Sequence, residues 1–121
     1  MYNIIIYEDE KGYSDIKSFI SELRKTSKNN KSDRINFEKV IAYIDLLEEM
    51  GTWIGEPVTK HLDGDIWELR PLSNRILFAI YDKDSYILLH HFVKKTNKTP
   101  KTEIDKAYRE LYDFKRRDCK P

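Results

Sequence analysis

The amino-acid sequence predicts one α+β domain, because apolar residues recur at helical spacing in three segments and at strand spacing in five others. The 121 residues suit a single domain, spanning 1–121, with a core of its own. Four of the strand segments are consecutive along the chain. This order favours a mostly antiparallel sheet of about five strands with helices packed against it.

The first part of the chain predicts a strand followed by a helical hairpin. Residues 2–7 are β-branched and aromatic, as is typical of a strand. From Ser14 or Asp15, either of which can be the N-cap, apolar residues take the i, i+3, i+4, i+7 spacing of an amphipathic helix. After a polar break, a second helix is predicted over 33–50, with Gly51 suited to its C-terminal cap.

The second part predicts a meander of strands and a final helix. Asp63 and Gly64 readily take the positive φ values of a tight hairpin turn. The last helix begins near Pro100, whose fixed φ suits a first helical position, with Thr99 able to cap it. The strand at 2–7 must join the meander to bury its apolar side chains. The four consecutive strands are predicted over residues 58–62, 66–70, 75–82 and 86–93.

Cysteine content and hydropathy limit where the protein can act. Cys119 is the only cysteine, so neither an intrachain disulfide nor a cysteine-based zinc site can form. The start of the chain lacks the basic and long apolar regions of a signal peptide, and no segment approaches the roughly 18 apolar residues of a membrane span. We therefore expect a soluble, cytoplasmic protein.

Charge is balanced overall but uneven along the chain. The formal net charge is +1. Residues 1–90 hold 12 basic and 16 acidic side chains, net −4, whereas residues 91–121 hold 10 and 5, net +5. This balance argues against a strongly basic nucleic-acid binder, but one basic face can still meet a partner that carries phosphates. A solvated basic C-terminal helix explains the same charges equally well.

Glu68, Arg70 and Arg75 surround one predicted turn. If Trp67 and Leu69 face the core, strand alternation sends Glu68 and Arg70 to the opposite side. Arg75 opens the next strand, so both guanidinium groups can point at one phosphate, which the planar fork of arginine binds through two oxygens. The alternative is that Arg70 pairs with Glu68 as part of the structure.

Histidines offer acid–base chemistry. His90 and His91 are adjacent on a strand and point to opposite faces, so only one of them can belong to a given site. A base, an acid and cations around the phosphate suffice to break an RNA phosphodiester without metal. His90 is the strongest candidate, ahead of His91 and His61. The three histidines lack the close spacing of a metal site.

The segment FVKKTNKTP places three lysines where the last strand meets the last helix. Lys94, Lys95 and Lys98, beside the free amides at a helix start, form a plausible anion-binding corner. Trp53 and Trp67 can stack on bases, although Trp67 is expected in the core and Trp53 at the end of the helical hairpin. Further cations that can follow an RNA backbone are Lys60, Arg116 and Arg117.

The sequence contains three linked motifs: WELRPLSNRILF, LLHHFVKKTNKTP and EIDKAYREL. Together they resemble the motifs of phage-derived HigB-like toxins, a branch of the RelE/ParE superfamily of type II toxin–antitoxin systems. The resemblance covers roughly residues 60–116. It implies a RelE-like fold and a toxin that cleaves messenger RNA in the ribosomal A site without metal or cofactor. It also implies a HigA-like antitoxin with a helix-turn-helix domain. The toxin is then expected to associate with DNA only indirectly, through this antitoxin.

The resemblance assigns roles residue by residue. Arg75 corresponds to the arginine that contacts the scissile phosphate in RelE-like members, and Arg70 to the first arginine of the LRxxxxR pattern. Lys94 and Lys95 fall in the basic corner before the last helix, where such toxins place a further phosphate-binding cation. His90 matches the histidine that marks this branch.

The sequence also departs from RelE. RelE has lysines at the positions of Ile66 and Glu68 and a tyrosine at that of Ile104, so proton transfer falls to Glu68 or His90, and Tyr108 is a candidate for base stacking. ParE-like members of the same superfamily act on DNA gyrase. A non-enzymatic inhibitor of a protein such as gyrase, and an inactive toxin that serves only in an antitoxin repressor complex, are therefore the alternatives.

Overall fold

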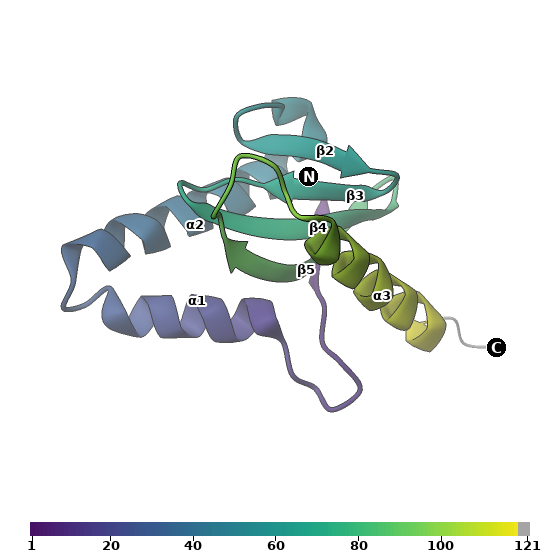
Figure 1. Ribbon diagram of the computed structural model, residues 1–121, viewed down its shortest axis with the longest axis horizontal. Helices are drawn as coiled ribbons and strands as arrows, with labels where there is room; N and C mark the ends of the chain where they lie inside the picture. Colours follow the sequence, from purple (N-terminus) through teal and green to yellow (C-terminus); the bar gives the residue numbers. More distant parts are fainter. Residues whose placement is uncertain (119–121) are drawn as a thin grey trace.

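The computed structural model describes residues 1–118, and Cys119 lies outside them. It confirms the predicted α+β class (Figure 1). In chain order the elements are β1 (Asn3–Ile6), α1 (Asp15–Thr26), α2 (Lys31–Met50), a 3₁₀ helix η1 (Gly51–Ile54), β2 (Thr59–Asp63), β3 (Ile66–Leu69), β4 (Asn74–Asp82), β5 (Ser85–Val93) and α3 (Lys101–Asp118). Among them is no helix long and apolar enough to cross a membrane.

The five strands form one mixed sheet in the order β1-β5-β4-β3-β2. The meander β2 to β5 is antiparallel, as predicted, and β1 adds to its far side by pairing parallel to β5. Register places Lys60 opposite Glu68, Glu68 opposite Leu77, and Leu77 opposite His90. Directly opposed residues project to the same face, so this row carries three of the predicted site residues to one side of the sheet.

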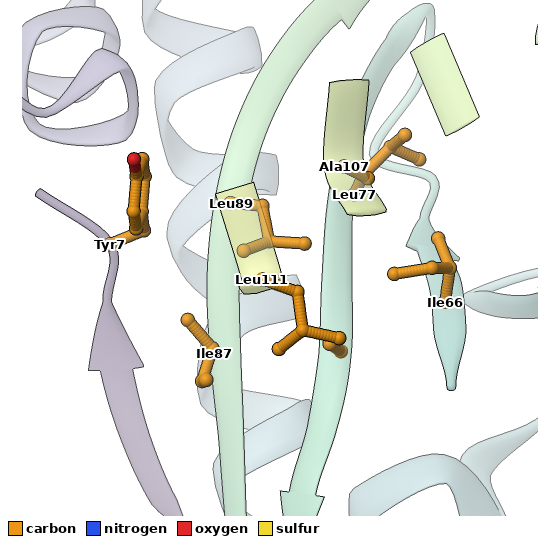
Figure 2. Close-up of a cluster of buried hydrophobic side chains, with 8 residues drawn as sticks. Tyr7, Ile66, Leu77, Ile87, Leu89, Ala107 and Leu111 are labelled. Atoms are coloured by element: carbon orange, nitrogen blue, oxygen red, sulfur yellow. The ribbon is translucent and has the colours of Figure 1, made fainter. Parts of the chain in front are cut away.

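Helices cover both faces of the sheet. Helix α3 packs on one face, over a core that includes Ile66, Leu77 and Leu89 from the strands and Leu111 from the helix (Figure 2). Helices α1 and α2 pack on the other face (Figure 1). The side chains of β4 and β5 are therefore buried on both sides, which explains their nearly continuous apolar sequence.

Local signals set most of the element boundaries. Ser14 caps α1 by accepting a hydrogen bond from the Lys17 amide at 3.1 Å, and Gly51 ends α2 with φ +64°, as predicted. Helix α2 begins two residues earlier than predicted, because Asn30 caps it by accepting from the Asp33 amide at 3.0 Å.

Thr99 does not cap the last helix, in contrast to the prediction. Its hydroxyl donates to Glu68 on β3 rather than capping α3, which begins at Lys101 directly after Pro100. The β5–α3 loop is thereby held against the sheet, and it crosses the face of β3 and β4 on its way from β5 to α3 (Figure 1).

Candidate functional site

A cavity of about 450 Å³ opens between the β5–α3 loop and the start of β4. Arg75 forms one wall, and the loop forms most of the rest. The cations at this cavity are Arg75, Lys94, Lys95 and Lys98, and the acid is Glu103 from the first turn of α3. The structure therefore brings the predicted lysine corner and Arg75 together in one concave, basic site.

Arg75 is held firmly in this wall. It is 6% exposed, and its Nη1 donates to the carbonyl oxygens of Leu72 and Asn74, both at 2.8 Å. Burial lowers the pKa of Arg75, as does the neighbouring Arg70, whereas Glu68 acts in the opposite direction. The guanidinium still stays charged at neutral pH, since arginine starts from so high a value. Its orientation is thus fixed before any anion arrives.

Arg70 and Arg75 converge on the carboxylate of Glu68. Glu68 Oε2 lies 3.5 Å from Arg70 Nε and 3.9 Å from Arg75 Nε, while Oε1 accepts the Thr99 hydroxyl. Glu68 is almost fully buried at 1% exposure. Arg70 also lies 3.7 Å from Glu56, and its buried Nε makes no hydrogen bond to the described residues. Only Arg75 of this triad lines the cavity.

His90 is completely buried beneath α3. Its Nδ1 lies 2.5 Å from Glu110 Oε1, and its Nε2 lies 2.9 Å from Glu103 Oε1. Each ring nitrogen of His90 therefore has a carboxylate oxygen within hydrogen-bond distance. His90 is thus near the cavity but separated from it by Glu103.

The remaining histidines lie elsewhere. His91 points to the opposite face, as strand alternation predicts, where Nδ1 bonds Asp15 at 2.6 Å and the ring stacks on Phe19 with a centroid distance of 3.9 Å. His61, on β2, has its Nε2 2.8 Å from the carbonyl oxygen of Gly64.

Glu103 is the site residue that the sequence reasoning missed. A signal was available: Glu103 and Glu110 are seven residues apart, so they lie on one face of a helix, and that helix follows the strand that carries His90. Recognising the pair required knowing that α3 would dock over β5. The side chain of Glu103 is 28% exposed and faces the cavity.

Two further hollows adjoin the cavity and share Lys98 and Thr99 with it. Lys60 lines the one of about 290 Å³, and Tyr108 lines the one of about 310 Å³. The Tyr108 hydroxyl donates to Asp63 Oδ2 at 2.6 Å, an interaction that, with some burial, raises the pKa of Tyr108 to about 12. Three predicted RNA contacts, Lys60, Lys98 and Tyr108, therefore border one surface.

Arg116 does not belong to that surface. It pairs with Glu10 at 2.8 Å and with Asp113 at 2.7 Å near the end of α3, about 20 Å along the helix from Glu103 at 1.5 Å per residue. Of the aromatic candidates, Trp67 is partly buried and packs against the core cluster that α1 and α2 cover, and Trp53 is 87% exposed on η1, at the end of the helical hairpin.

Metal ligands do not gather in the described part of the chain: residues 1–118 contain no cluster of three or more His, Cys, Asp or Glu side chains that could hold a metal ion. The polar groups of the cavity are instead guanidinium, ammonium and carboxylate groups. Such a set can bind an anion and move a proton beside it.

Comparison with known proteins identifies the family. The model of the family "Phage derived protein Gp49-like (DUF891)" matches residues 21–112, so the chain belongs to this family. The matched range contains the cavity and its cations. A search of the curated proteins finds no significant match.

Two solved structures resemble the chain at low sequence identity. One is the YoeB-YefM complex from Staphylococcus aureus, at 13% identity and a TM-score of 0.47, covering 75% of this chain and 94% of the other. A second, a heterotetrameric YoeB-YefM toxin-antitoxin complex from the same organism, has 12% identity and a TM-score of 0.46, with coverage of 79% and 98%.

Proposed function

We propose that this protein is a HigB-like toxin of a type II toxin–antitoxin system, a single RelE-like domain that acts in the cytoplasm by cleaving messenger RNA on the ribosome. The observation that carries the proposal is the convergence of Arg75, Lys94, Lys95 and Lys98 on one cavity. Membership of a phage-derived family and the motif resemblance support it. The partners proposed are mRNA on the ribosome and a HigA-like antitoxin, which alone would bring the toxin to DNA.

In this proposal the scissile phosphate lies against Arg75. The buried guanidinium is already fixed by two carbonyl oxygens, so it loses little freedom when it binds the phosphate. Arg70 contacts the same Glu68 carboxylate as Arg75 and offsets part of its negative charge, so Arg75 keeps more of its positive potential for the phosphate. Lys94 and Lys95, both exposed on the loop, stabilise the charge that develops on phosphorus as the RNA 2′-oxygen attacks.

The sequence predicts that Glu68 or His90 transfers the proton. Both have neighbours that restrict such a role. Glu68 faces two guanidinium groups and the Thr99 hydroxyl, so the β5–α3 loop must shift before Glu68 can reach RNA. His90 has no exposed atoms and engages both ring nitrogens with glutamates. Either residue therefore acts on the RNA only through a neighbour or after the loop moves.

The test is primer extension on a reporter transcript, with and without ribosomes, using the wild type, Arg75→Lys and Arg75→Ala. Arg75→Lys keeps the charge but loses the planar fork, and we expect it to lower cleavage on the order of 10²-fold. Arg75→Ala should abolish cleavage and growth arrest, provided that thermal unfolding shows a folded variant. Arg116→Ala, far from the cavity, serves as the control.

Ribosome-dependent cuts within codons that vanish in the Arg75 variants would support the proposal. Intact RNA with arrested growth would overturn it and favour a non-enzymatic inhibitor of a protein such as DNA gyrase. Intact RNA with normal growth, in a protein that still binds an antitoxin, would favour an inactive toxin.

A further inference from the structure

Two carboxylates and one imidazole form a continuous chain that leads from the core to the cavity. Glu110 contacts His90 Nδ1, and Glu103 contacts His90 Nε2. His90, in the middle of this chain, has a side chain that is 0% exposed, whereas the side chains of Glu110 and Glu103 are 14% and 28% exposed. Glu103 is the only member that lines the cavity.

We propose that Glu103 is the general base that takes the 2′-hydroxyl proton of the RNA, and that His90 and Glu110 are positioning residues that hold it in place. The inference rests on the proposed endoribonuclease function and names the group that would perform its proton transfer. It replaces direct action by His90 or Glu68 with action by a residue already at the cavity surface.

The position of Glu103 suits this role. Glu103 shares the cavity with Arg75, the proposed phosphate ligand, and with Lys94 and Lys95. Its Oε1 accepts from His90, while Oε2 accepts no hydrogen bond from the described residues. One oxygen is thus anchored and the other is available to a substrate, which is the arrangement that a base needs for fixed geometry.

The role of His90 follows from its burial. Its ring lies between the two carboxylates and holds both of them, through hydrogen bonds, beside a strand of the core. Because β5 is a central strand and His90 has no exposed surface, its ring cannot swing away from Glu103 without opening the α3 interface. Glu110 fixes the far side of the ring in turn.

Glu103 takes the proton from the 2′-hydroxyl, the 2′-oxygen bonds to phosphorus, and the bond from phosphorus to the 5′-oxygen breaks. A cavity lysine ammonium gives its proton to the departing 5′-oxygen, and the products are a 2′,3′-cyclic phosphate and a 5′-hydroxyl. The Glu103 proton returns to the lysine through water, so no oxidant, reductant or cofactor is consumed.

The experiment measures single-turnover cleavage on programmed ribosomes, together with RNA binding, for the wild type, Glu103→Gln and Glu38→Gln. Glu38 is an exposed glutamate of α2 on the other side of the sheet and controls for loss of one charge. We expect Glu103→Gln to cleave 10²- to 10⁴-fold more slowly with unchanged RNA binding, and to lose the fall in rate at acidic pH that the wild type shows.

Two further variants distinguish chemistry from structure. Glu103→Ala should regain part of its rate when formate is added, because a small carboxylate can occupy the vacated space. His90→Gln should reduce the rate and change the pH profile while RNA binding is retained. If His90→Gln fails to fold, Glu110→Gln tests the same anchoring from the partly exposed side.

The outcomes separate the two proposals. If the wild type cleaves RNA and Glu103→Gln cleaves within threefold of it, the role of Glu103 is overturned and the endoribonuclease function stands. A loss in Glu103→Gln without formate rescue of Glu103→Ala, accompanied by weaker RNA binding, would also overturn it. If the wild type itself does not cleave RNA, the proposed function fails and the role of Glu103 fails with it.

Discussion

Asp15, the first residue of α1, accepts two hydrogen bonds from His91 of β5, one from the backbone amide at 2.8 Å and one from the ring Nδ1 at 2.6 Å, both on the same Oδ2. The two residues are 76 positions apart. Phe19, one turn further along α1, stacks on the same imidazole. A single carboxylate therefore fixes the N-terminal end of α1 to the sheet.

We expect Asp15→Asn to lower the free energy of unfolding by about 1–2 kcal/mol, because hydrogen bonds to a charged acceptor are stronger than those to a neutral one. Urea denaturation at pH 7 measures the change. Asp45→Asn, on the exposed side of α2, should stay within about 0.5 kcal/mol of the wild type.

The same contact predicts an acid-dependent stability. Burial raises the pKa of Asp15, but hydrogen bonds from the His91 side chain and amide outweigh it, so the pKa is lowered overall. A lowered acid pKa contributes stability above the ordinary value near 4 and loses it as the pH falls through the folded-state value. Asp15→Asn should flatten this dependence below about pH 4, and an unchanged slope would contradict the assignment.

Lys95→Ala should weaken RNA binding and reduce its dependence on salt. Removing one phosphate contact from a single-stranded RNA lowers the slope of log K against log salt by about 0.7. Fluorescence anisotropy with a short RNA across a salt series measures the slope. Lys83→Ala, in the turn at the opposite end of the β4–β5 hairpin, should leave the slope unchanged.

Tyr7→Phe should destabilise the protein and alter its alkaline unfolding. Burial, followed by the hydrogen bond to Asp113 at 2.7 Å, raises the pKa of Tyr7 to about 12. The stability from this raised pKa is fully present below about pH 10 and is lost as the pH rises through 12. We expect a loss of about 0.5–1.5 kcal/mol at pH 7.

Denaturation between pH 7 and 11 provides the check. The difference between the wild type and Tyr7→Phe should shrink above pH 10. Tyr112→Phe, at a tyrosine that is 71% exposed, is the matched control and should show neither effect. If the difference in unfolding free energy between the wild type and Tyr7→Phe stays constant over this pH range, the hydroxyl stabilises the protein without ionising, and the pH effect predicted here is wrong.

Gly51→Ala should be more damaging than Gly12→Ala, although both glycines have positive φ, +64° and +83°. A Cβ on Gly51 would lie 2.6 Å from the Tyr86 hydroxyl and 2.7 Å from the Tyr2 ring, whereas one on Gly12 meets nothing within 4 Å. Both variants bear a backbone cost of about 1–2 kcal/mol, and Gly51→Ala adds an overpacking cost of about 1–3 kcal/mol. Thermal unfolding of the pair isolates the second contribution.

Much of the fold could be predicted from sequence because its signals are local. Ser14, Gly51 and Gly64 mark boundaries through their own backbone conformations or short-range hydrogen bonds, and the strands of the meander neighbour each other along the chain. The direction of β1 could not be predicted in this way, since an apolar run shows that a strand is buried but not which strand it pairs with.

Predictions about the site also depended on whether the residues concerned are close together or far apart along the chain. The proximity of Arg70 and Arg75 could be anticipated because one short turn separates them, but both contact Glu68, the pairing given above as the alternative for Arg70, and only Arg75 lines the cavity. The position of Glu103 depends on how α3 docks over β5, and the distance of Arg116 from the cavity depends on the direction that α3 takes from there. Such placements arise from packing between distant segments: the seven-residue spacing of Glu103 and Glu110 predicts that they share a helix face, but not which strand that face covers.

The parallel pairing of β1 with β5 has a consequence for how the sheet is completed. Asn3 lies opposite Ser85, so β1 has no partner in the sheet until the segment about 80 residues further along the chain has been made. The hairpins of the meander close short loops and can form first, whereas β1 must close a loop of about 80 residues, which is entropically costlier and slower. The N-terminal strand is therefore the last part of the sheet expected to assemble, and until it does, the backbone edge of β5 is open to other chains.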